Sequence, residues 1–222
     1  MTQRALIIGA SGGIGAAVAQ NLTHRGWEVH GLSRARDGLD LTDQASVDAQ
    51  LSALEGPYEL VFMASGILAA DGSAPEKALS QIRQKSFEEV FKVNTFGVGY
   101  VLRHAPKLLP KKGRSVLAVL TARVGSIGDN QIGGWHAYRA SKAAANQLVH
   151  GAAIELGRSH KEAIAVALHP GTVATDFTAE YAARHTTVTP AEAADNLVTV
   201  MLGLTQAESG QFFDYAHKPI VW

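Results

Sequence analysis

Two side chains four residues apart carry the clearest chemical signal in this sequence. Tyr138 and Lys142 lie in the segment 135–156, an alanine-rich window with the pattern of one helix, between Gly134 and Gly157. Residues four apart share a helix face, so we expect the phenol and the ammonium side by side. A cation this close lowers the pKa of a tyrosine, which is about 10 in water. Such a pair can pass a proton to a forming alkoxide or take one from an alcohol. The alternative is an ordinary Tyr–Lys pair on a solvated helix.

A glycine-rich turn joins the first predicted strand, residues 5–8, to the first predicted helix, residues 16–25. With a second strand over 27–32, this pattern predicts a βαβ unit. Glycine allows a tight bend and close approach of a phosphate, and the helix start offers free N–H groups and a positive dipole end. The candidate phosphate contacts in this turn are Gly9, Ser11, Gly12, Gly13, Ile14 and Gly15.

The glycine spacing at 9, 13 and 15, taken with Tyr138-x-x-x-Lys142, resembles the short-chain dehydrogenase/reductase family. The resemblance covers essentially the whole chain. It implies an α/β fold: a single doubly wound Rossmann domain over residues 1–222, with a mostly parallel sheet of about seven strands, helices on both faces and an integrated substrate pocket. It also implies that Tyr138 donates the proton and that Lys142 holds the nicotinamide ribose.

The end of the second predicted strand favours NADP(H) over NAD(H). An NAD-binding fold usually carries an acid here, bonded to the ribose hydroxyls. This chain has Ser33 and Arg34 instead, and a guanidinium can clamp a 2′-phosphate in a fork. The alternative is that Arg34 is a solvated loop residue.

Further cofactor contacts follow from the family resemblance alone. Asp40 and Leu41 correspond to the segment beside the adenine ring. The turn after the third predicted strand (Ala64, Ser65 and Gly66) and the run after the fifth (Pro170, Gly171, Val173 and Thr175) complete the set. Two helix starts are predicted from residue type: Asp43 as an N-cap, and Thr189 as the N-cap of a capping box with Glu192.

Asn94 lies inside the longest helical window, residues 86–108, and is followed by Gly97. The pair matches the family's Asn-x-x-Gly motif. The resemblance implies that Asn94 opens a kink in this helix and holds a water that relays protons to Lys142.

The chain departs from the family at the serine that usually bonds the substrate oxygen. That position, three before Gly125, holds Ala122, which has no hydroxyl. Strand alternation turns Thr121 away from the side that Ala122 faces, whereas Ser126 could fold back toward Tyr138. The sequence does not assign the role to either, and we favour Ser126. The segments 124–127, 133–135 and 210–215 resemble the C-factor and sniffer-type carbonyl reductase branch.

The composition of the chain indicates which kinds of partner and which kinds of site are not expected. The chain has 222 residues, a formal net charge of zero and no cysteine, and no His pattern suggests a metal site. We expect no nucleic-acid partner, no membrane partner, no metal and no signal peptide, and hence a cytoplasmic protein. The family resemblance implies pairing through the helices over 86–108 and 135–156, and we therefore expect a homodimer or homotetramer.

The sequence therefore predicts an NADP(H)-dependent oxidoreductase acting on a small carbonyl or alcohol substrate. The rival hypothesis is a cofactor-binding signalling or redox-sensor protein with little turnover, which Ala122 favours. A sugar-nucleotide epimerase is a weaker alternative, because such enzymes are longer and carry an added substrate domain.

Overall fold

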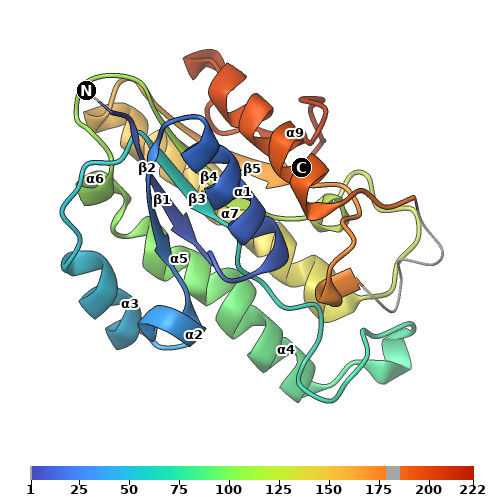
Figure 1. Cartoon of the computed structure of the whole chain (residues 1–222). Helices are drawn as coiled ribbons and strands as arrows, with labels where there is room; N and C mark the ends of the chain where they lie inside the picture. The colour runs from blue at the N-terminus through green and yellow to red at the C-terminus, as the bar shows by residue number, and fades with distance from the viewer. Residues whose placement is uncertain (1, 179–185) are drawn as a thin grey trace.

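The computed structural model describes residues 2–178 and 186–222, and its centre is one twisted sheet (Figure 1). Six strands in the order β2-β1-β3-β4-β5-β6 pair in parallel throughout. Short, almost wholly buried apolar runs form the four central strands, as expected of a parallel sheet covered on both faces. The strands are β1 (Arg4–Ile8), β2 (Glu28–Leu32), β3 (Leu60–Met63), β4 (Ser115–Leu120), β5 (Ala163–His169) and β6 (Phe212–Asp214).

Helices cover both faces of this sheet. One face packs against α1 (Gly13–His24) and α9 (Pro190–Gly203), which lie side by side in Figure 1. The other face packs against the remaining longer helices, and alternate residues of each strand supply the two cores. The remaining helices are α2 (Arg34–Asp37), α3 (Gln44–Ser52), α4 (Gln84–Phe91), α5 (Gly97–Leu102), α6 (Ala105–Leu108) and α7 (His136–Ser159).

The predicted α/β doubly wound fold is confirmed, but the described residues form six strands rather than about seven. The segment after α2 shows why no further strand pairs beyond β2. Its N–H groups are used locally: Leu39 donates to the Ser33 carbonyl, Asp40 to the Ser46 hydroxyl and Thr42 to the Asp40 carboxylate. In a β-ladder these N–H groups would have to donate to a neighbouring strand, so the segment cannot add a strand to the sheet.

The helical window 86–108 is not one helix. A π-helical turn, Lys92–Phe96, separates α4 from α5, and α6 follows after a break. By contrast, α7 runs unbroken for 24 residues, close to the predicted range. The N-cap predictions are confirmed: Asp43 accepts from the Ala45 N–H, and Thr189 and Glu192 form a capping box.

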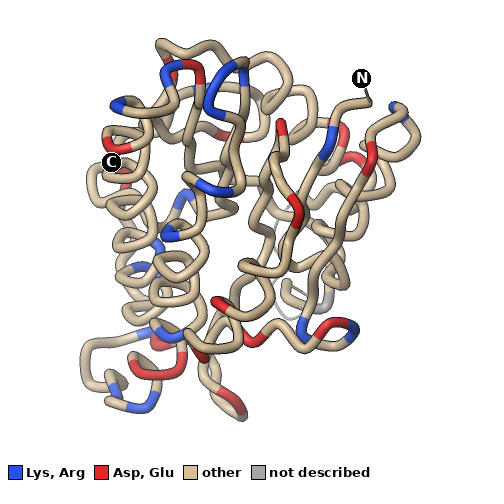
Figure 2. Tube along the Cα trace, turned by 90° about the vertical axis from the view of Figure 1, so that its left-hand side faces the viewer, with Lys and Arg blue, Asp and Glu red and all other residues tan. Residues whose placement is uncertain are grey.

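The described helices were compared with the length and apolarity that a membrane span requires. In the part of the chain that the structure describes, no helix combines the length and apolarity needed to cross a bilayer. Figure 2 shows Lys and Arg interspersed with Asp and Glu along the chain, in keeping with the zero net charge of the sequence.

Candidate active site

The predicted cofactor residues gather at the carboxyl ends of β1 and β3, where the strand order reverses. The turns that follow these strands touch each other: a Cβ added at Gly9 would lie 2.6 Å from the Ser65 hydroxyl. Ala64 continues the pairing one residue past β3, donating to the Ile8 carbonyl. The two turns, about 55 residues apart in the sequence, therefore form one continuous surface.

The glycine-rich turn has the features of a phosphate cradle. A Cβ at Gly13 would meet the Thr175 side chain at 2.7 Å, so only glycine brings the turn against the loop after β5. Helix α1 starts after Gly12 with no side-chain cap and no acid in its first turn. Its positive end is thus open to an anion. The residues present fit a dinucleotide.

The end of β2 holds two residues that sequence reasoning missed. The Ser33 hydroxyl caps α2 and bonds the Asp37 carboxylate, so an acid does lie here, supplied by the next turn. Arg36 reaches back to the Ala10 carbonyl in the glycine-rich turn. Arg34 is exposed at the start of α2. Ser33 and Arg34 signalled this site in the sequence, whereas the position of Arg36 and the folding back of Asp37 were not readable from it.

Asp40 lies close enough to Arg34 for the Arg34 charge to act on it, and Leu41 follows Asp40 in the chain. The Asp40 carboxylate accepts from the Thr42 N–H and hydroxyl, which lowers its pKa, with a smaller contribution from the Arg34 charge. Leu41 packs against α5, because a Cβ at Gly97 would come within 2.8 Å of the Leu41 Cβ.

Tyr138 and Lys142 are brought together in the interior, as predicted, on the face of α7 that packs against the sheet. Both are buried, with exposed fractions of 6% and 4%. The Lys142 ammonium lies 5.8 Å from the centre of the Tyr138 ring and donates to the Leu120 carbonyl at 3.1 Å. The solvated-pair alternative is therefore wrong.

The predicted direction of the Tyr138 pKa is wrong for this structure. Burial raises the pKa of the Tyr138 phenol above its ordinary value, because a phenolate loses its hydration there. Burial likewise lowers the pKa of Lys142 to about 8. Desolvation by burial is the cause of both shifts.

Asn94 joins this pair through the π-helical turn. Its side chain bonds both the N–H and the carbonyl of Ile67, each at 2.8 Å, and donates to the Ser141 hydroxyl. A Cβ at Gly66 would lie 3.1 Å from both Asn94 Oδ1 and Lys142 Nζ. The kink expected at Asn94 is present, but its amide is already bonded to protein. The role of Asn94 in holding a relay water stays a prediction.

Aromatic and apolar side chains surround Tyr138. The rings of Trp135 and Phe177 lie 6.2 and 6.1 Å from it, centre to centre. Ala122 is buried in the same apolar cluster as Tyr138. The wall facing a substrate is thus aromatic, and the Ala122 position offers it only a methyl group.

Ser126 does not fold back toward Tyr138, which corrects the expectation. Ser126 is 1% exposed, and its hydroxyl donates to the Val221 carbonyl and accepts from the Asp129 N–H. Both of its hydrogen-bonding roles are used to hold the loop after β4 against the segment 220–222. The Thr121 hydroxyl is buried and has no hydrogen-bond partner in the residues described.

The loop after β5 completes the site. Gly171 has a left-handed backbone with φ 78°, and Val173 is buried and pairs with Val188. Pro170 is buried at the start of this loop, and Thr175 lies against Gly13 as described. Residues 179–185 lie outside the described residues.

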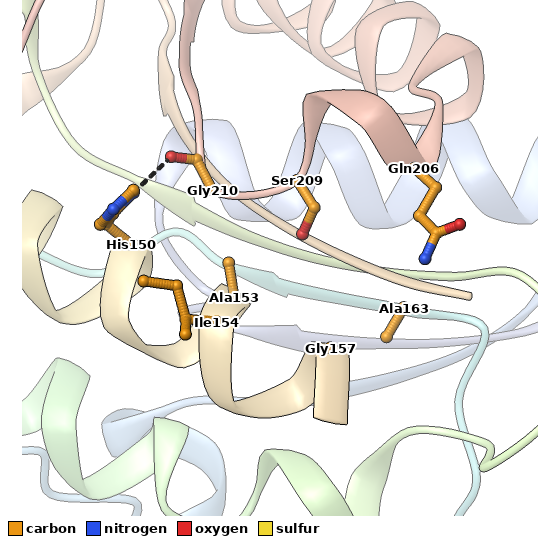
Figure 3. A pocket seen from close by; sticks show the side chains of 8 residues that line it. All are labelled: His150, Ala153, Ile154, Gly157, Ala163, Gln206, Ser209 and Gly210. Carbon is orange, nitrogen blue, oxygen red and sulfur yellow. Dashed lines mark hydrogen bonds between the residues drawn. The ribbon is translucent and has the colours of Figure 1, made fainter. Parts of the chain in front are cut away.

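A surface hollow elsewhere is separate from these residues. It has a volume of about 160 Å³ and lies between α7 and the turn η5 (Gln206–Glu208), where His150 bonds the Gly210 carbonyl (Figure 3). Its wall includes Ala163, the first residue of β5, whereas the candidate site lies past the other end of that strand. It is not part of the candidate site.

Comparison with known proteins identifies the family. The family model of the short chain dehydrogenase matches residues 38–186. The chain belongs to the short-chain dehydrogenase family. A 1-hydroxy-2-glutathionyl-2-methyl-3-butene dehydrogenase of Rhodococcus sp. (strain AD45) is 31% identical, with 93% of this chain and 94% of that protein covered. The C-signal protein of Myxococcus xanthus is also 31% identical, over 75% of this chain and 94% of that one. As a member of this family, the protein is an oxidoreductase enzyme.

Solved structures of this short-chain dehydrogenase family share the fold. A short-chain dehydrogenase/reductase from Burkholderia multivorans with bound NADP superposes with a TM-score of 0.85 at 24% identity, over the whole of both chains. The carbonyl reductase Sniffer of D. melanogaster gives 0.85 at 22% identity, also over both whole chains. The resemblance to the C-factor and sniffer branch is thereby confirmed.

Proposed function

We propose that this short-chain dehydrogenase is an NADP(H)-dependent carbonyl reductase or alcohol dehydrogenase. The observation that carries the proposal is the meeting of three elements at Gly66, where an added Cβ would lie only 3.1 Å from both Asn94 Oδ1 and Lys142 Nζ. A nicotinamide cofactor, when bound, would supply or accept the hydride. The relatives' names point the same way, since one is a dehydrogenase and one structure is a carbonyl reductase.

Tyr138 is the proposed proton donor in reduction and acceptor in oxidation. Its raised pKa keeps the phenol protonated until a substrate oxygen develops charge. Lys142 has N–H groups beyond the one donated to Leu120, and these would hold the cofactor ribose and stabilise the phenolate. Asn94 fixes the loop at Ile67, which keeps Gly66 beside the lysine.

The cofactor would lie on the glycine-rich turn, the turn 64–66 and the loop after β5. We propose a preference for NADP(H), supported by Arg34 and now by Arg36 beside the glycine-rich turn. Asp37 opposes this preference, but its carboxylate is already bonded to the Ser33 N–H and hydroxyl. The bound NADP of the Burkholderia multivorans structure supports the same choice.

A second function is favoured by Ala122. Without a hydroxyl there, the substrate oxygen lacks a second hydrogen bond, and the loss of one such donor typically costs about 2.7–4 kcal/mol of transition-state stabilisation. A cofactor-binding signalling or redox-sensor protein with little turnover would tolerate this loss. The similarity to the C-signal protein is its other support.

The assembly and location stay predictions. We infer that residues 1–222 act as one domain with an integrated pocket, in the cytoplasm, as a homodimer or homotetramer. Exposed apolar side chains on the π-helical turn and α7, Phe96, Leu148 and Ile154, support pairing through these helices.

Oxidation of NADPH with a panel of aldehydes and ketones separates the two functions. Tyr138→Phe should abolish turnover and leave the NADPH dissociation constant within about twofold, because only the proton donor is lost. Tyr100→Phe, which removes a phenol from α5, is the matched control and should turn over normally. Turnover by Tyr138→Phe at the unmutated rate would move the chemistry elsewhere, and no turnover by the unmutated protein would favour the sensor.

A further inference from the structure

Glu76 is a buried acid in an exposed loop. Between residues 71 and 83, only Pro75 and Glu76 are buried, and Glu76 is 5% exposed. Removing a carboxylate from water is costly unless it gains hydrogen bonds. The contacts of this side chain therefore show what holds the loop in place.

Glu76 takes the place of a missing helix cap on α7. The residue before the helix, Trp135, makes no side-chain cap. Instead, Glu76 Oε2 accepts from the Ala137 N–H at 3.3 Å, and the Glu76 carbonyl accepts from the Trp135 N–H. Ala137 is the second residue of the helix, one of the positions that a capping side chain normally serves. The other oxygen, Oε1, is buried without a hydrogen bond among the residues described, so one oxygen carries the cap.

The chain enters α7 through three left-handed residues in succession. Gly133, Gly134 and Trp135 have φ values of 69°, 66° and 50°. Glycine adopts this backbone freely, but a tryptophan does not, so Trp135 needs outside support. Arg139 supplies part of this support by donating to the carbonyls of Gly133 and Gly134. Glu76 supplies another part, because its backbone carbonyl accepts from the Trp135 N–H.

This support acts on the reacting end of the helix. Tyr138 is the next residue after Ala137, and the Trp135 ring packs edge-on against the Tyr138 ring. The loop that carries Glu76 leaves β3 through the turn 64–66, where the cofactor is proposed to lie. We propose that Glu76 is a positioning residue that fixes Tyr138 relative to the cofactor by capping α7 from another segment. This inference rests on the proposed oxidoreductase function.

Substitutions of Glu76 test the cap through the split between kcat and KM. Glu76→Ala should lower kcat about tenfold to a hundredfold, because a displacement of a reacting group by about 1 Å can cost about a hundredfold in rate. The KM for NADPH should stay within about twofold. Glu76→Gln keeps one oxygen acceptor and should retain at least about a third of kcat. Thr205→Ala, which removes a capping box from η5 at the far end of the sheet, is the control for lost stability and should keep kcat.

Hydrogen exchange gives a readout that does not need turnover. Amides in the first turn of α7, residues 137–140, should exchange at least about tenfold faster in Glu76→Ala than in the unmutated protein or Glu76→Gln. If Glu76→Ala does not fold, Glu76→Asp, too short to reach Ala137, replaces it in both measurements. Unchanged exchange, or a Glu76→Gln variant as impaired as Glu76→Ala, would overturn the proposal. Absence of any carbonyl reduction by the unmutated protein would instead count against the proposed function, and exchange would still decide the role of Glu76.

Discussion

At the scale of single residues, Ala122 determines how fast the proposed reaction can run. Its side chain belongs to the apolar cluster around Tyr138, and the nearest serine along the chain is bonded elsewhere. A hydroxyl at 122 would give the substrate oxygen a second hydrogen bond. We therefore expect Ala122→Ser to raise kcat/KM about tenfold or more on a good carbonyl substrate.

The matched variant for Ala122→Ser is Ser126→Ala. It should leave kcat within about twofold and lower the free energy of unfolding by about 1–1.5 kcal/mol, because it removes a buried hydrogen bond. Steady-state kinetics with one substrate and chemical denaturation measure both effects. The reverse pattern, with Ser126→Ala slow and Ala122→Ser silent, would return the substrate contact to Ser126.

Lys142 gives a prediction that links pH to stability. Its pKa is about 8 in the folded protein and about 10.5 when unfolded, so the folded state disfavours the charged form. The resulting penalty is complete below pH 8 and disappears as the pH rises through 10.5. Lys142→Met should therefore stabilise the protein by about 2–3 kcal/mol at pH 7, and the gain should shrink toward pH 10.5. It should also abolish turnover.

Urea denaturation at several pH values measures the Lys142 effect. Lys85→Met is the control, because Lys85 is 66% exposed and carries no burial penalty. A Lys142→Met protein that is less stable than the unmutated one at pH 7 would show that the contact with the Leu120 carbonyl outweighs desolvation.

The sequence predicted which residues are candidates for chemistry better than it predicted their hydrogen-bond partners. Tyr138 and Lys142 lie four apart on one helix, so their proximity follows from helix geometry alone. Ser126 depends on Val221, 95 residues away, and Glu76 depends on a helix start 61 residues away. No local pattern contains such pairings, and this is why Ser126 was wrongly favoured as the substrate contact and Glu76 was missed.

At the scale of elements, the segment 220–222 holds the loop that follows β4. The Val221 carbonyl accepts from Ser126, the Trp222 carbonyl accepts from the Gly128 N–H, and the Trp222 ring stacks on Phe212 at 5.7 Å. We expect Trp222→Ala to lower the free energy of unfolding by about 1–2 kcal/mol, since the ring is only partly buried. For a chain of this size that corresponds to a Tm lower by roughly 2–8 °C.

Amide exchange locates the effect of Trp222→Ala. The amides of residues 126–129 should exchange faster, whereas those in the first turn of α7 should not change. Val221→Ala is the control: the Val221 side chain is mostly exposed, and its carbonyl bond to Ser126 survives the substitution. Equal destabilisation by both variants would show that the ring does not anchor the loop.

Elements were predictable where their signals are local. Asp43 and Thr189 cap helices within three residues of their own position, and both caps were predicted from residue type. The π-helical turn at Asn94 was readable only as a kink, because the window keeps helical spacing through it. The count of about seven strands came from the family resemblance, and the structure has one fewer because the donors of residues 39–42 bond within their own turn.

At the scale of the whole molecule, the candidate site is assembled from the ends of separate strands. The turns after β1, β3 and β5 meet there. A bound cofactor would therefore bridge segments that are far apart in the sequence and are joined mainly through the sheet. A ligand that binds only the folded state stabilises it by mass action. Cofactor choice should therefore be visible as a difference in melting temperature.

We expect NADPH to raise Tm more than NADH at equal concentration, because on the proposed cofactor preference Arg34 and Arg36, at the start of α2 and beside the glycine-rich turn, would bond the 2′-phosphate. A tenfold difference in dissociation constant corresponds to about 1.4 kcal/mol, or roughly 3–6 °C for a protein of this size. Arg34→Ala and Arg36→Ala should each reduce the NADPH shift and leave the NADH shift unchanged, whereas Arg25→Ala, at the far end of α1, should affect neither. An equal or larger shift with NADH would mean that Asp37 acts as the ribose acid and that this enzyme uses NAD(H).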